Sequence, residues 1–241
     1  MKILTTKLLL TLVLTFTLVF TFTFTFSQTP VRFYSNAKAG YKNPVSGAVI
    51  VEPKYDAGSD FREGFAIVIT GRKRGYINEK GEVAIPLQYD DASQFFGGLA
   101  RVTVGGKNGY INYKGEFVIQ PIYNFADDFI DGLARVARNG KFGFINTKGE
   151  AIIPFMYDDA RNFAEGLAAV KKDGHWGFID PKGTLIIPLQ YNDAFFFHGG
   201  IARVSDGTKG FYIDKNNKWV KDEEKHEEEW ETKNAPNKNE K

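Results

Sequence analysis

Hydrophobic and polar residues alternate in short runs along most of the chain, and glycine-rich turns separate the runs. In GLARV at 132–136, successive side chains would point to opposite faces of a strand. This run ends at Asn139-Gly140, a dipeptide that suits the two positive φ angles of a type I′ hairpin. A second strand is expected at 141–146, followed by a tight turn at 146–149. A third, AIIP at 151–154, is expected to stop at its proline, which has no N–H for a ladder. The pattern predicts a meander of three short strands.

The same pattern returns every 34 residues, which is the strongest feature of the sequence. Two framework positions recur in every copy: Phe61, Phe95, Phe129, Phe163 and Phe197, and Ile77, Ile111, Ile145, Ile179 and Ile213. A tyrosine column precedes them at Tyr55, Tyr89, Tyr123, Tyr157 and Tyr191. Five near-copies therefore cover residues 41–220.

A three-stranded meander cannot bury both faces alone, so neighbouring copies are expected to supply the partner surface and form one continuous core. The chain is predicted to be all-β, an array of about five meanders wound into an open superhelical β-solenoid. A closed five-bladed propeller is the alternative, which the short copies disfavour, because propeller blades have four strands and about forty residues.

The pattern KxGFIDxxG-xxIIP-xxYDxAxxF-xxGLAxV, seen at 141–170 and 175–204, resembles the WG (KWG) repeat family of bacterial proteins. The tryptophan position holds Arg74, Asn108, Phe142 and Trp176, so one copy keeps the family's namesake residue. The first copy has an irregular turn at 43–47 and the last loses its turn glycine at 217–218, as expected of terminal caps. The resemblance implies a β-rich array in envelope or exported proteins, usually without an established activity, and it supplies no catalytic residues.

The two ends of the chain differ from the array. Residues 1–27 combine Lys2 and Lys7 with an apolar run at 8–26 and small residues before Gln28, the layout of a signal peptide cleaved after Ser27. An uncleaved anchor is the alternative, because about twenty apolar residues can span a bilayer. Residues 28–40 are predicted to be a linker, and 221–241 a charged flexible tail. The protein is therefore expected to be periplasmic, cell-surface or secreted.

Composition and charge exclude several classes of function. Loss of Lys2 and Lys7 takes the formal net charge from +2 to 0, and no concentrated basic face suggests nucleic acid. The sequence has no cysteine, so there is no disulfide framework. No nucleophile elbow, zinc-protease helix or phosphate loop occurs, and the three histidines occupy different repeat registers. We expect no enzymatic activity, no cofactor and no metal site.

Paired carboxylates at Asp90-Asp91 and Asp158-Asp159 could suggest acid–base chemistry. Their first position, however, reads Asp56, Asp90, Asn124, Asp158 and Asn192 through the copies. Aspartate and asparagine interchange where only a hydrogen-bond acceptor is needed, so this column is predicted to be structural.

Two columns are candidate binding residues. Arg101, Arg135 and Arg203 share one strand register; they either pair with nearby carboxylates or form a basic stripe for a carboxylate- or phosphate-bearing partner. Phe142 and Trp176 lie in the variable column; they either pack between repeats or stay exposed and stack on sugars or peptides.

These patterns predict a non-enzymatic exported repeat protein, an interaction or scaffold module at the cell envelope. The alternative is a carbohydrate- or peptidoglycan-binding module built on Phe142 and Trp176. The expected partner is a protein or an envelope polymer, with membrane contact only through the signal segment before cleavage.

Overall fold

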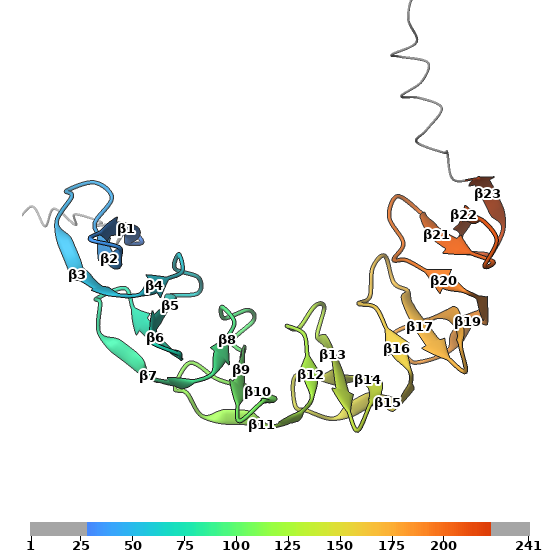
Figure 1. Cartoon of the computed structure of the whole chain (residues 1–241), viewed down its shortest axis with the longest axis horizontal. Helices are drawn as coiled ribbons and strands as arrows, with labels where there is room; N and C mark the ends of the chain where they lie inside the picture. Colours follow the sequence, from blue (N-terminus) through green and yellow to red (C-terminus); the bar gives the residue numbers. More distant parts are fainter. Residues whose placement is uncertain (1–27, 223–241) are drawn as a thin grey trace, which may run out of the picture.

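The computed structural model describes residues 28–222 (Figure 1). The predicted signal peptide lies outside these residues, as does the predicted tail from residue 223 onward. All strands of the described part belong to six antiparallel sheets, one for each repeat and one at the N-terminal end. The described residues contain no helix that could span a membrane.

The first sheet has three strands and the other five have four. The first contains β1 (Val31–Ser35), β2 (Lys38–Lys42) and β3 (Val49–Tyr55). The second contains β4 (Ala57–Gly58), β5 (Phe65–Thr70), β6 (Lys73–Asn78) and β7 (Val83–Tyr89), and the third β8 (Asp91–Ala92), β9 (Ala100–Val104), β10 (Lys107–Ile111) and β11 (Phe117–Tyr123). The fourth contains β12 (Phe125–Ala126), β13 (Leu133–Arg138), β14 (Lys141–Asn146) and β15 (Ala151–Tyr157). The fifth contains β16 (Asp159–Ala160), β17 (Ala168–Lys172), β18 (His175–Ile179) and β19 (Leu185–Tyr191), and the sixth β20 (Asp193–Ala194), β21 (Ile201–Ser205), β22 (Gly210–Asp214) and β23 (Trp219–Asp222).

The prediction of three strands per copy misses a short fourth strand. The segment after each tyrosine, which lies outside the three predicted strands, pairs with the next sheet; Ala160 of β16, for example, lies opposite Val170 of β17. Chain that leaves one sheet therefore forms the first edge of the next, and consecutive repeats share backbone hydrogen bonds.

The prediction that the third strand stops at its proline is also wrong. Strand β19 continues through Pro188 to Tyr191, because the strand bulges there: Phe178 lies opposite Ile187, and Trp176 lies opposite Tyr191. Gly177, between them on β18, makes the bulge possible, since a Cβ at this position would lie 2.5 Å from the Ile187 carbonyl oxygen. A proline in a bulge removes no ladder hydrogen bond. Gly177 therefore permits the close approach of the two backbones.

Residues 28–40, predicted to be a linker, instead contain β1 and the start of β2. Asn36 and Ala37 form the turn between the strands with φ angles of 50° and 60°. Ala39 and Tyr41 of β2 are completely buried in the cluster with the second sheet, which provides the apolar contact that orders this segment. The array thus begins before residue 41, and at its other end β23 extends to Asp222.

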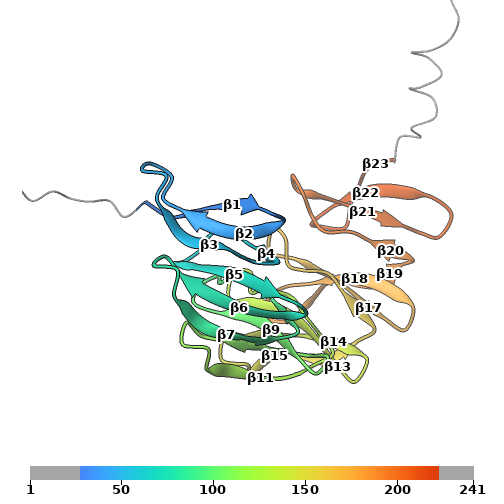
Figure 2. The same cartoon turned by 60° about the vertical axis from the view of Figure 1, so that its left-hand side comes forward.

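The core is divided into five clusters, each between two consecutive sheets, and it is not one continuous core. Between the first two sheets, for example, Tyr41 and Val51 pack against Val68 and Ile77. Figure 1 shows the six sheets following one another round an arc, and Figure 2 shows their strands from another side. The prediction of an all-β repeat array is confirmed.

Candidate functional site

The aspartate and asparagine column accepts hydrogen bonds from the β-hairpin turns. Asp158 Oδ2 accepts from the Asp173 N–H at 2.8 Å, and Asn124 Oδ1 accepts from the Asn139 N–H at 3.3 Å. The Lys141 ammonium and the Asp173 N–H hold the pKa of Asp158 below its ordinary value. Because Asn124 accepts the equivalent hydrogen bond in another copy, only an acceptor is needed at this position, and the structural interpretation of this column is confirmed.

The arginine register is paired with carboxylates. Arg135 Nε donates to Asp127 Oδ2 at 2.9 Å, and Nη2 of the same guanidinium lies 2.8 Å from that oxygen. Arg135 also donates to the Ala160 carbonyl of the next sheet. Arg101 Nη1 lies 3.2 Å from Asp91 Oδ2, and Arg203 Nη1 lies 4.0 Å from Asp193 Oδ2. The predicted pairing with nearby carboxylates is therefore present, and it links neighbouring elements; binding of an outside partner by this register stays a prediction.

The aromatic column lies between sheets. Trp176 is 4% exposed and packs in the cluster between the fifth and sixth sheets, with the Arg161 guanidinium 5.1 Å from its ring centroid. Phe142 is half-buried and packs against the cluster between the fourth and fifth sheets; within its own sheet, its ring centroid lies 5.7 Å from that of Phe125. Packing between repeats is therefore confirmed. The alternative, an exposed ring, does not hold at Trp176, because the neighbouring sheet covers its side chain.

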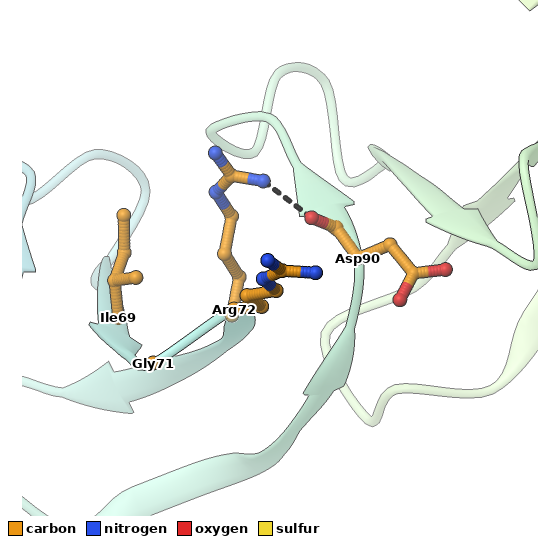
Figure 3. A pocket seen from close by; sticks show the side chains of 5 residues that line it. Ile69, Gly71, Arg72 and Asp90 are labelled. Carbon is orange, nitrogen blue, oxygen red and sulfur yellow. Dashed lines mark hydrogen bonds between the residues drawn. The ribbon is translucent and has the colours of Figure 1, made fainter.

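An open pocket of about 430 Å³ lies beside the β5–β6 turn, lined by Ile69, Gly71, Arg72, Arg74 and Asp90. Arg74 donates to the Asp90 carbonyl oxygen at 2.5 Å, and the same guanidinium pairs with Asp91 at 2.8 Å. Figure 3 shows Ile69, Gly71, Arg72 and Asp90 around this pocket. The Asp90 carboxylate is held by Lys73 at 2.7 Å. Of the two arginines that line the pocket, Arg72 has no charged partner among residues 28–222, so a bound anion would meet a single uncommitted cation here.

The tight loops between the first two strands of each four-stranded sheet share one conformation. In the loop 164–167 the two end residues exchange backbone hydrogen bonds of 3.0 and 3.1 Å, and both central residues have positive φ, 50° at Glu165 and 86° at Gly166. The other four loops, 62–65, 96–99, 130–133 and 198–201, show the same pairing and the same positive φ values. This geometry leaves two adjacent N–H groups for an outside acceptor.

Two of these loops hold a carboxylate from the preceding repeat. The N–H groups of Gly97 and Gly98 donate to Oε1 and Oε2 of Glu63 at 2.8 and 3.1 Å. Those of Gly199 and Gly200 donate to the two oxygens of Glu165 at 2.7 and 3.0 Å. These bonds, that of Gly200 foremost, hold the pKa of Glu165 below its ordinary value. The loop is a carboxylate cradle, meaning two adjacent N–H groups that bind the two oxygens of one carboxylate.

A third donor completes each occupied cradle. The Tyr113 hydroxyl donates to Glu63 Oε2 at 2.9 Å, and the Lys215 ammonium lies 3.3 Å from Glu165 Oε2. Tyr113 and Lys215 occupy the same repeat position, and the equivalent residue beside the loop 164–167 is Pro181.

A cavity of about 150 Å³ lies at the cradle of Glu165 and Gly166; it is lined by Ile130, Asp131, Leu133, Phe163, Ala164, Glu165, Gly166 and Pro181. The binding predictions from the sequence miss this site. One available signal is the column that reads Glu63, Gly97, Asp131, Glu165 and Gly199, which holds only acids and glycines. This cavity is the candidate functional site.

Comparison with known proteins supports the repeat assignment. The family model for the WG containing repeat matches residues 40–73, 75–107, 109–142, 142–175 and 176–209. No curated protein matches the sequence. Among solved structures, Kluyveromyces lactis Hsv2 has a TM-score of 0.45 at 11% identity, with 78% of this chain and 72% of that chain covered. The extracellular domain of BT4673 from B. thetaiotaomicron has a TM-score of 0.43 at 13% identity (80% and 33% covered), and PorZ of Porphyromonas gingivalis 0.38 at 9% (81% and 31%).

Proposed function

Since the chain belongs to the WG containing repeat family, we propose that it is a non-enzymatic, exported repeat protein that serves as an interaction or scaffold module at the cell envelope. Export is inferred from the signal-peptide pattern of residues 1–27. The interaction role is inferred from the row of tight loops along the array.

The loop row carries this proposal. Glu63 joins its own loop to the loop 96–99, and Glu165 joins its loop to 198–201, so these loops lie next to each other from one repeat to the next. Apolar side chains are exposed on the row: Phe96 and Ile130 are each 45% exposed. Extended rows of equivalent loops are surfaces on which repeat proteins bind macromolecules.

A non-enzymatic role is supported by how the acidic side chains are used. Asp90, Asp158 and Glu165 have lowered pKa values, and each accepts hydrogen bonds from backbone N–H groups and from a lysine. A carboxylate held ionised in this way stabilises a turn and is a poor general acid. The carbohydrate-binding alternative has less support, because the Trp176 ring on which it depends is covered.

The array is proposed to be an open solenoid. In the internal sheets an isoleucine faces the neighbouring sheet, but on the outward faces of the two end sheets a lysine takes its place. Lys42 occupies the position equivalent to Ile77, and Lys221 the position equivalent to Ile187. Closure into a propeller would bring both ammonium groups into one apolar interface, which is costly without a counter-charge. Figure 1 agrees with this inference, since the first and last sheets lie at the two ends of the arc.

Site-directed photo-cross-linking on native envelopes tests the interaction role. A photoreactive residue at position 96 or 130 should capture the same partner, whereas position 45, which is 74% exposed but lies off the row, should not. Equal capture from position 45 would refute the loop row as the interaction surface. Fractionation with N-terminal sequencing tests export, with Gln28 expected as the first residue of the exported protein.

A further inference from the structure

We propose that the cradle of Glu165 and Gly166 binds the carboxylate of an outside ligand, a short aliphatic acid or a carboxyl group presented by a partner protein. The inference extends the proposed function, because it names the chemical group that a partner on the loop row would present. Binding of a free acid tests the cavity by itself, so either proposal can fail while the other stands.

The chain itself shows that this backbone conformation binds carboxylates. In both occupied cradles the first N–H of the loop donates to Oε1 and the second to Oε2, at distances that agree within 0.1 Å between the two sites (2.8 and 3.1 Å; 2.7 and 3.0 Å). The φ angles of Glu165 and Gly166, 50° and 86°, match those of Gly97 and Gly98, 58° and 82°. The donors at the candidate site are thus already oriented for a bidentate carboxylate.

The internal acid that could occupy this cradle does not reach it. The preceding repeat has Asp131 where the occupied cradles have Glu63 or Glu165, and its side chain is one methylene shorter. No side chain among residues 28–222 accepts a hydrogen bond from the Glu165 or Gly166 N–H. The carboxylate of Glu165 is directed to the next loop, where it binds Gly199 and Gly200. Pro181, which has no donor, takes the place of Tyr113 and Lys215.

The cavity walls define the rest of the ligand. Ile130, Leu133, Phe163 and Pro181 provide apolar surface around a volume of about 150 Å³, which suits a short alkyl chain. Asp131 also lines the cavity and repels an anion, so binding to the native protein is weak. The ligand is therefore a carboxylate with a short apolar chain.

Butyrate is the probe, titrated into isotope-labelled protein spanning residues 28–241 and followed by the amide NMR signals. The Glu165 and Gly166 amide protons should move downfield and saturate, while butyramide and n-butanol at equal concentration should leave them unmoved. Asp131→Asn removes the repelling charge and should tighten butyrate binding by about threefold. Asp131→Glu restores the missing methylene, so its own carboxylate should fill the cradle and abolish binding.

The two Asp131 variants are a matched pair, because both keep a polar side chain at an exposed loop position. Butyrate binding that survives Asp131→Glu unchanged, equal shifts with butyramide, or amide protons that never respond would each overturn the proposal. A peptide ending in leucine with a free carboxyl terminus, and an amidated peptide with one internal glutamate, then identify the source. Displacement of butyrate by the peptide with the free terminus indicates that the ligand is a chain terminus. Displacement by the amidated peptide indicates an acidic side chain, and displacement by neither assigns the cavity to free acids.

Discussion

Gly177→Ala is the substitution that tests the repeat geometry most directly. A Cβ at this position would lie 2.5 Å from the Ile187 carbonyl oxygen and 2.8 Å from the carbonyl carbon and oxygen of Pro188. All three are backbone atoms of β19, so relief of the clash requires the bulged strand to move by about 0.9 Å, the difference between 2.5 Å and an ordinary contact of about 3.4 Å. Overpacking of this kind costs about 1–3 kcal/mol, and each ladder hydrogen bond lost with it about 1 kcal/mol. We expect a total loss of about 2–5 kcal/mol.

Urea unfolding followed by circular dichroism measures the loss, and hydrogen–deuterium exchange measures where it falls. Because each sheet packs mainly on its neighbours, exchange should accelerate in the fifth and sixth sheets and stay unchanged in β5 to β7. The control is Gly174→Asn: Gly174 has a φ of +84° in open space, and asparagine tolerates this conformation. If Gly177→Ala unfolds within about 0.5 kcal/mol of the control, the bulge is not held by the missing Cβ.

Three other positions can be tested in the same way: a turn acceptor, a buried tryptophan and a lysine on an end face. Asp158→Asn should keep the hydrogen bond to the turn, whereas Asp158→Ala should lose it. Because the folded pKa of Asp158 is lowered, the ionised carboxylate of the native protein should stabilise the fold above the unfolded pKa of about 3.9, and this stabilisation should be lost as the pH falls through the folded pKa. Acid titration of the native protein and of Asp158→Asn compares the two. Trp176→Ala should destabilise by about 3–5 kcal/mol in urea, whereas Trp219→Ala, at a side chain 60% exposed, should change stability by less than about 0.5 kcal/mol. Lys221→Ile should expose an apolar end face and cause concentration-dependent association in size-exclusion chromatography; an unchanged elution volume would contradict the capping role of this lysine.

Most of the strand and turn positions could be predicted from the sequence, because they depend on local backbone preferences repeated five times. The hairpin at 139–140 is an example: Asn139 and Gly140 have φ angles of 54° and 76°, as the type I′ prediction requires. The Asp and Asn column is another, since residues that interchange between copies reveal that only an acceptor is needed. Each of these turn and strand features can be recognised in one copy of the repeat, and its recurrence in the next copy supports it.

The features that the sequence does not reveal depend on a second strand. A strand of two residues, such as β16, has no periodicity of its own and exists only because β17 lies beside it. Pro188 looks like a strand end until its position opposite Gly177 is known, since the bulge belongs to the pair of strands. The first sheet is missed for a related reason: its turn uses Asn36 and Ala37, which carry no glycine signal.

The aromatic column shows why variation among copies does not indicate exposure. Arg74 pairs with Asp91 at 2.8 Å, and Trp176 lies under the Arg161 guanidinium. Both side chains sit at the same repeat position, and each meets a different neighbour. A position can therefore vary because its partner varies with it, and the side chain can still be buried, as Trp176 is at 4% exposure.

The length of the side chain in the preceding repeat determines whether each cradle is filled from within the chain. At Glu63 and Glu165 the side chain reaches the next loop and joins two repeats, and the loop becomes part of the scaffold. At Asp131 the side chain is too short, so the next loop keeps two oriented N–H groups beside an apolar cavity. At Gly97 there is no side chain, and in residues 28–222 no carboxylate binds the N–H groups of Asp131 and Gly132. A row of equivalent loops can thus combine structural links with open sites without any change in backbone conformation. This is the physical reason to search for ligands at the loops where the acid is short or missing.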